Sequence, residues 1–277
     1  MAKPGRKGKM DSLWGGLWGG PWGGVTGGLS PVLFAIALGV TFFAGFVKGA
    51  VGFAMPMIMI SALSSFLPPH MALAALILPT LFTNISQAFR QGLAAFWATV
   101  VVWRRYLVVT VVALVISAQF VDAIPQGWFL AALGLPITLF AALRLWGVPL
   151  AVQVRHRARL EVGSAVVGGL YGGVSGVWGP PLLVYLISTG AQKDETVRVQ
   201  GVVFLIGAVV LLAAHLQSGV LNAVTLPFSA VLVVPAVAGL WLGYAVQDRL
   251  DQARFARWTQ VLLIATGVNL MRRAVGW

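Results

Sequence analysis

The chain has 277 residues, of which 59% are hydrophobic and only 9% are charged. Because soluble globular domains carry about 25% charged residues, this composition excludes a soluble globule and predicts a protein that crosses a membrane several times. The formal net charge of +12 does not indicate a nucleic-acid partner, since nearly all lysines and arginines lie in the N-terminal tail and in segments that connect apolar stretches, where they determine topology.

Residues 1–28 form a basic tail that is rich in glycine and tryptophan. Its tryptophans recur every four residues, at Trp14, Trp18 and Trp22, and the amphipathic indole ring favours the membrane–water interface. The glycine content favours disorder. No apolar stretch separates the basic residues from the glycines, so a cleavable signal peptide is not expected.

The rest of the chain contains apolar segments that we expect to be helical, five in each half. About 20 apolar residues are needed to cross a bilayer as a helix. The segments are approximately 29–47, 52–67, 71–90, 100–121, 127–147, 160–174, 176–190, 197–216, 224–246 and 256–274. The predicted fold is an all-α polytopic membrane protein with one repeat at residues 29–150 and a second at residues 151–277.

A glycine motif occurs once in each half. Residues 45–56 read GFVKGAVGFAMP and residues 169–180 read GLYGGVSGVWGP. Three glycines and the final proline coincide at a constant offset of 124 residues, without a gap: Gly45, Gly49, Gly52 and Pro56 correspond to Gly169, Gly173, Gly176 and Pro180. Two homologous halves explain this most simply. Because proline lacks an N–H and glycine tolerates non-helical dihedral angles, each copy predicts a broken helix.

The basic residues indicate how the two halves are oriented. They mark different connections in the two halves: Arg90, Arg104 and Arg105 in the first, and Arg249, Arg254 and Arg257 in the second. The second-half connection equivalent to that of Arg90, Arg104 and Arg105 is residues 217–223, which carry no charge. The first-half connection equivalent to that of Arg249, Arg254 and Arg257 holds only Asp122. Since lysine and arginine favour the cytoplasmic side, equivalent loops are expected on opposite sides, which predicts an inverted repeat. Ten crossings would place the basic N-terminus outside the cytoplasm, where lysine and arginine are disfavoured. We therefore expect between eight and ten crossings.

The two predicted breaks form a candidate anion site, because broken helices direct N–H groups and positive helix ends into the membrane. Lys48 lies inside the first copy, and an intramembrane cation commonly marks function, although a lysine can also extend to the interface. The glycines have an alternative role in close helix packing, and the aromatic residues in packing. The candidate substrate-binding residues are Gly45, Lys48, Gly49, Gly52, Pro56, Asn84, Gln87, Tyr171, Gly172, Gly173, Gly176, Trp178, Gly179 and Pro180.

The same motifs resemble those of a known family. GFVKGAVGFAMP, followed by PPHMALA and later by GGLYGGVSGVWGPPLLVYLI, is similar to the two signature repeats of the TauE/SafE family of sulfite and organosulfonate exporters, also called the toluene sulfonate uptake permease family. The resemblance begins near residue 30 and continues to the C-terminus. One departure is Phe53-Ala54-Met55, where such motifs often contain more glycine.

This resemblance implies a secondary transporter of small sulfur-containing anions, such as sulfite, thiosulfate or sulfoacetate, in the lipid bilayer of a bacterial inner membrane. We expect alternating access around the two breaks, and an anion channel is the alternative. Apart from Glu161, at the edge of segment 160–174, no aspartate or glutamate lies within an apolar segment, which argues against a carboxylate relay. There is no HExxH motif, cysteine or carboxylate pair, so we expect no metal, cofactor or enzymatic activity. The sequence leaves the oligomeric state open.

Overall fold

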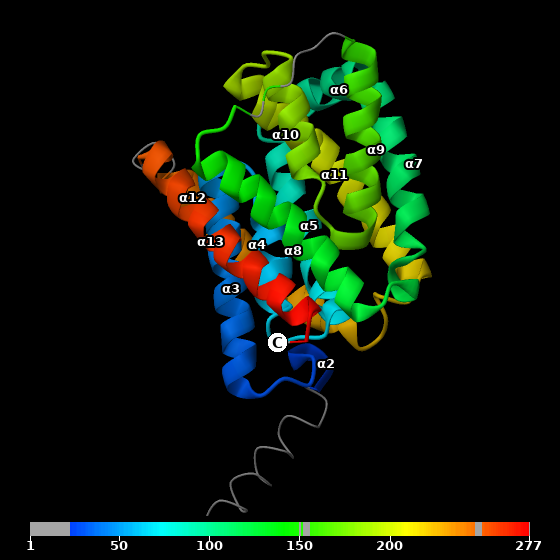
Figure 1. Ribbon diagram of the computed structural model, residues 1–277, viewed down its shortest axis with the longest axis vertical. Helices are drawn as coiled ribbons and strands as arrows, with labels where there is room; N and C mark the ends of the chain where they lie inside the picture. Colours follow the sequence, from blue (N-terminus) through cyan, green and yellow to red (C-terminus); the bar gives the residue numbers. More distant parts are fainter. Residues whose placement is uncertain (1–22, 150, 152–155, 247–250, 277) are drawn as a thin grey trace, which may run out of the picture.

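The computed structural model describes residues 23–149, 151, 156–246 and 251–276, and all regular structure within them is helical (Figure 1). The elements are α2 (Gly23–Thr26), α3 (Pro31–Val51), α4 (Met55–Leu63), α5 (Pro69–Ala88), α6 (Leu93–Val102), α7 (Arg104–Ala118), η1 (Val121–Ala123), α8 (Gln126–Leu145), α9 (Arg157–Ser175), α10 (Gly179–Ser188), α11 (Lys193–Gln217), α12 (Thr225–Val246) and α13 (Gln252–Ala274). The all-α prediction is confirmed for this part of the chain. The three tail tryptophans lie outside it.

The helices follow the predicted apolar segments closely, except at the fourth segment. In place of one helix over 100–121, the chain forms α6 and α7, which are bent by 79° relative to each other. The buried ring of Trp103 lies at the bend, where its centroid is 6.1 Å from that of Tyr106 and 5.6 Å from that of Tyr185. These aromatic contacts hold the bend, and we infer that they outweigh the continuous apolar pattern of the segment.

Within the part of the chain that the structure describes, five helices are long and apolar enough to span a membrane: α3, α5, α8, α11 and α12. The bent pair of α6 and α7 raises this to six if the two helices make one span. The predicted eight to ten crossings are therefore not confirmed. The short α4 and α10 account for part of the difference, because each follows a helix break.

Both predicted helix breaks are confirmed. The chain leaves α3 at Gly52 (φ +87°), whose N–H donates to the carbonyl of Lys48 at 2.7 Å. It leaves α9 at Gly176 (φ +70°), whose N–H donates to the carbonyl of Gly172 at the same distance of 2.7 Å. This left-handed conformation is accessible to glycine without the steric cost that other residues meet, so the repeated glycine fixes the position of each break.

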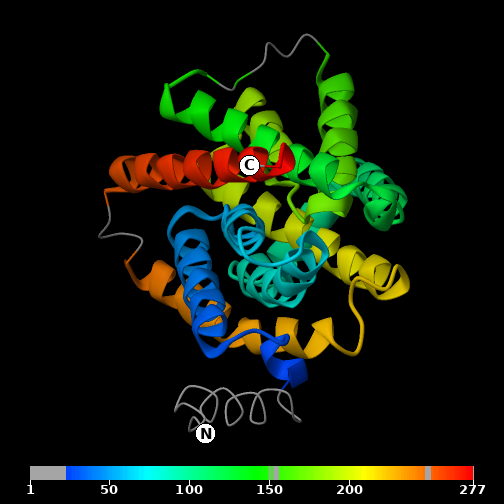
Figure 2. The same ribbon diagram turned by 60° about the horizontal axis from the view of Figure 1, so that its bottom comes forward.

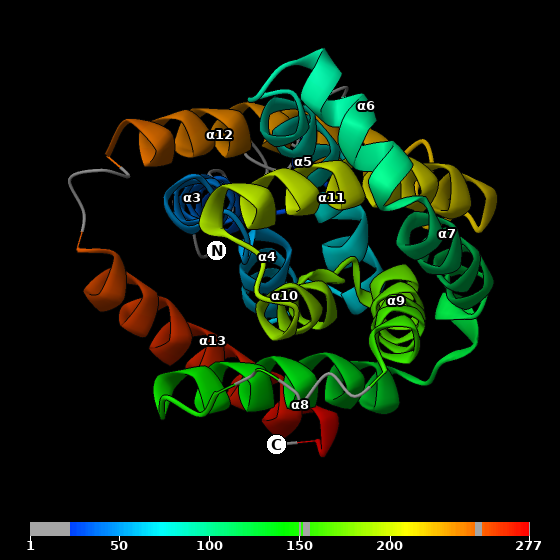
Figure 3. The ribbon, with the colours of Figure 1, turned by 90° about the horizontal axis from the view of Figure 1, so that it is seen from above.

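After the second break the chain turns back on itself. A Cβ added to Gly172 would overlap the ring of Trp178, and one added to Gly168 would lie 3.6 Å from the Cβ of Pro181. Thus α10 runs back along α9, and α4 likewise packs against α3. We call α3–α4 hairpin 1 and α9–α10 hairpin 2. Seen from above, α4 and α10 lie near the centre of the molecule (Figure 3).

The motif glycines of hairpin 1 bring α3 against α12. A Cβ on Gly45 would overlap the carbonyl oxygen of Ala236, and one on Gly49 would overlap that of Leu240. Because residue numbers increase together along both helices, α3 and α12 run parallel. Glycine is needed here to let the two backbones approach closely.

Hairpin 2 packs in the equivalent way against α7. A Cβ on Gly169 would overlap the carbonyl oxygen of Thr110, and one on Gly173 would overlap that of Leu114. These two helices also run parallel. Each hairpin is therefore held by the fourth-segment helix of the other half of the chain.

The remaining long helices pair in opposite directions. The guanidinium of Arg198, near the start of α11, donates to the Oε1 of Gln91, just after the end of α5, at 3.4 Å. Helices α8 and α13 lie side by side along one edge of the molecule (Figures 2 and 3), with Gly134 against Gly267. The buried core includes most of the side chains of α4 and many of those of α5.

Candidate functional site

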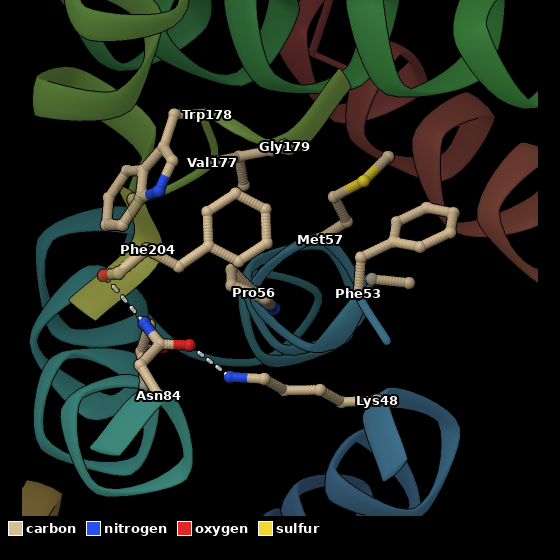
Figure 4. Close-up of a pocket in the computed structure, with 12 residues that line it drawn as sticks. Lys48, Phe53, Pro56, Met57, Asn84, Val177, Trp178, Gly179 and Phe204 are labelled. Atoms are coloured by element: carbon tan, nitrogen blue, oxygen red, sulfur yellow. Dashed lines mark hydrogen bonds between the residues drawn. The ribbon is translucent and has the colours of Figure 1, made fainter. Parts of the chain in front are cut away.

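The two helix breaks face one cavity (Figure 4). Both hairpins, α5 and α11 contribute to its wall. The lining residues are Lys48, Phe53, Ala54, Pro56, Met57, Thr80, Asn84, Gly176, Val177, Trp178, Gly179 and Phe204. The two copies of the motif, 124 residues apart in sequence, thus meet at a single place.

Lys48 supplies the charge of this cavity. It lies in the last turn of α3, ahead of the break rather than inside it, and its side chain is 1% exposed. The Nζ group donates to the Oγ1 of Thr83 at 2.9 Å and to the Oδ1 of Asn84. Both acceptors are neutral. Since an ammonium has three N–H donors, one is left for a further acceptor, and an anion would also supply the missing countercharge.

Asn84 is oriented by contacts on both sides of its amide. Its Nδ2 donates to the carbonyl of Phe204 at 2.8 Å, so its Oδ1 is directed toward Lys48 (Figure 4). The hydroxyl of Thr83 donates to the carbonyl of Pro79 at 2.7 Å, which leaves the oxygen of that hydroxyl free to accept from the ammonium. The helix α5 therefore holds the lysine in place without neutralising it.

The sequence analysis missed six residues of the cavity wall: Phe53, Ala54, Met57, Thr80, Val177 and Phe204. The hydroxyl of Thr80 is buried in the cavity wall without a hydrogen-bond partner, and its spacing of four residues from Asn84 could have revealed it. The ring of Phe204 lies between the Lys48–Asn84 pair and the second break, 6.2 Å from the indole of Trp178 by ring centroids (Figure 4). No sequence signal distinguishes Phe204 from the other apolar residues of its segment.

The helix starts contribute fewer amide donors than expected. Residues Gly179, Pro180 and Pro181 begin α10, and of these only Gly179 has an N–H. In α4, Pro56 removes one donor in the same way. We infer that most of the positive potential of the cavity comes from Lys48 and less from the ends of the helices.

Equivalent positions of the two hairpins carry residues of different size. Lys48 in hairpin 1 corresponds to Gly172 in hairpin 2, and Ala54 corresponds to Trp178. The absence of a side chain at Gly172 makes room for the indole ring of Trp178, since an added Cβ would lie 2.7 Å from its Cε3. Hairpin 1 therefore supplies a cation to the cavity, and hairpin 2 supplies an aromatic wall.

Several predicted site residues lie outside the cavity wall. Gly45, Gly49 and Gly173 make the helix contacts described above, which is the packing role that the sequence left open. Gln87 is buried beside the cavity, where its Nε2 donates to the carbonyl of Gly52 at 3.0 Å.

Tyr171 and Pro180 face a different space. Both line a second cavity, between α8 and hairpin 2. The hydroxyl of Tyr171 donates to the carbonyl of Leu133 at 3.2 Å, so it is not directed at the first cavity. His215 is fully buried, with its Nε2 3.1 Å from the carbonyl oxygen of Gly173.

The apolar helices and the buried cation at a cavity lined by both hairpins define a polytopic helical membrane transport protein. The sequence profile described as sulfite exporter TauE/SafE matches residues 36–270, which is most of the chain, and the chain belongs to this family. Neither a curated protein nor a solved structure matches it.

Proposed function

We propose that the protein is a secondary transporter that exports small sulfur-containing anions, such as sulfite or organosulfonates, across a bacterial inner membrane. The observation that carries this proposal is Lys48, a buried ammonium held by two neutral oxygens at the cavity between the hairpins. An anion that enters the cavity would form a charge-assisted hydrogen bond with it. Membership of a family of sulfite exporters supports the substrate class.

The wall of the cavity suits a substrate with one charged end and one apolar end. Lys48, Thr80 and Asn84 present polar groups from one side, whereas Met57 and Phe204 contribute apolar surface. A sulfonate group has three oxygens that can accept from the ammonium and the hydroxyl, and its organic part would contact the apolar surface. Sulfite would use only the polar side.

Alternating access is supported by how the helices pair. Helix α3 of hairpin 1 runs parallel to α12, and α9 of hairpin 2 runs parallel to α7, while α5 and α11 run in opposite directions. If each helix is replaced by its equivalent in the other half of the chain, residues 29–150 for 151–277, the same set of helix pairs results. An inverted repeat accounts for such a pattern, and movement of one half against the other would expose the cavity to each side in turn.

An anion channel is the second candidate, because the same breaks could form a selective constriction. Counterflow separates the two functions. A carrier in proteoliposomes takes up labelled sulfite faster when unlabelled sulfite is present on the far side, whereas a channel shows no such stimulation. We expect stimulation, since residues of both hairpins line the cavity and would move with the two halves.

The decisive variant is Lys48→Gln, which removes the charge but keeps a hydrogen-bonding side chain. Hydrogen bonds to charged groups contribute about 1.5–3 kcal/mol, so we expect sulfite flux in proteoliposomes to fall roughly 10-fold or more. The matched control is Arg272→Gln, which removes one positive charge from the exposed end of α13. Equal flux in the two variants would exclude Lys48 from the binding site.

A further inference from the structure

A row of polar side chains on α5 connects the cavity with one end of the molecule. Thr80, Asn84, Gln87 and Gln91 follow one another at spacings of three or four residues, which places them on one face of the helix and its extension. The first two line the cavity, Gln87 is buried beyond it, and Gln91 is exposed.

A second glutamine from the other half of the chain reaches the same face. Gln200 of α11 is 2% exposed, and its Oε1 would lie 3.7 Å from a Cβ added to Gly52. Gln87 contacts the same glycine through its hydrogen bond to the carbonyl. The first helix break is therefore flanked by two buried glutamines, one from each half.

Each of these glutamines keeps one amide atom without a partner. They are the Oε1 of Gln87 and the Nε2 of Gln200, both fully buried. An unsatisfied buried polar group destabilises a fold by about 1–3 kcal/mol. Two such atoms beside one glycine suggest a role outside stability, such as contact with a polar ligand on its way through.

The exposed end of this polar row is basic. Gln91 accepts a hydrogen bond from Arg198, and the guanidinium of neighbouring Arg90 lies 4.4 Å from the ring centroid of Tyr244. Positive charges at an opening raise the local concentration of anions. At the other end of the cavity, the indole of Trp178 is packed tightly against Gly207.

We propose that the transported anion moves between the cavity and the basic end along α5, and that Gln87 and Gln200 form the gate of this route. In the closed state Gln87 holds the carbonyl of Gly52. When the break moves, the amide N–H groups of both glutamines donate to the oxygens of the passing anion. This inference rests on the proposed transport function, and it adds the route and the gate to it.

Introduced cysteines test the route directly, because the natural chain contains none. Gln200→Cys should react with a negatively charged methanethiosulfonate at least 10-fold faster than Ser61→Cys, an equally buried site on α4 that lies off the route. The positively charged reagent should react more slowly with Gln200→Cys, since the entrance is basic.

Cysteines at two exposed positions identify the side of the membrane from which the reagent enters. Gln91→Cys reports the basic end, and Asn222→Cys reports the opposite end of α11. We expect Gln200→Cys to react only from the side that labels Gln91→Cys. Labelling only from the side of Asn222→Cys, or no labelling from either side, would overturn the route.

A substitution of the gate separates a transport role from a structural one. Gln200→Leu removes an unpaired buried amide, so its melting temperature should be unchanged or higher, whereas sulfite flux should fall at least 10-fold. Normal flux would contradict the gate. Because labelling does not require transport, reactive Gln200→Cys together with normal flux in Lys48→Gln would reject the proposed binding site and retain the route.

Discussion

Lys48 illustrates how one residue can be both buried and functional. Its ammonium is held by Thr83 and Asn84, and among the described residues it has no acidic partner. A carboxylate at this position would satisfy the lysine permanently. Neutral oxygens hold the charge and leave its countercharge to the substrate.

This reasoning predicts the effect of Asn84→Asp. The new carboxylate would form an ion pair with Lys48 and would compete with the substrate for it, so we expect sulfite flux to fall roughly 10-fold or more. The protein should still fold, because the ion pair satisfies both groups. Flux and melting temperature should be measured on the same preparation, with Asn84→Gln as the uncharged control. Undiminished flux in Asn84→Asp would contradict the role of the free charge.

At the scale of elements, the repeated glycines have two separate roles. Gly52 and Gly176 adopt the left-handed conformation at the breaks. Gly45, Gly49 and their equivalents let α3 and α9 approach α12 and α7 closely. One motif therefore places a helix break and attaches the hairpin that carries it, which explains why the spacing of the glycines is the same in both halves.

The packing role can be tested within a single helix. Gly45→Ala places a methyl group against the backbone of Ala236 and should destabilise the protein by about 1–3 kcal/mol. Gly39→Ala, six residues earlier in α3, meets no atom within 4 Å and should be neutral or stabilising because alanine favours helix. Thermal unfolding in detergent compares the two. Equal melting temperatures would show that the close contact is unimportant.

At the scale of the whole molecule, each half depends on the other. Hairpin 1 rests on α12 and hairpin 2 rests on α7, so neither half contains all the contacts of its own hairpin. The cavity also needs residues from both halves. We therefore expect neither repeat to fold or bind substrate alone.

The proposed inverted repeat predicts where equivalent loops lie. Ala123, before α8, and Arg254, near the start of α13, occupy corresponding connections and are both exposed. Single cysteines at these positions should react with an impermeant thiol reagent from opposite sides of the membrane. The unsubstituted, cysteine-free chain is the control. Labelling of both positions from the same side would contradict the inverted repeat.

The sequence alone determined the helical class, the segments and the two breaks, because these depend on local properties: apolar length, glycine conformation and the missing N–H of proline. It also identified Lys48, since a cation within an apolar segment is conspicuous. Only the tertiary structure decided that the breaks fold back as hairpins, that Tyr171 and Pro180 face another cavity, and that Phe204 and Gln200 approach the breaks. Those outcomes depend on packing between helices that are distant in the sequence, and no local sequence pattern predicts such packing.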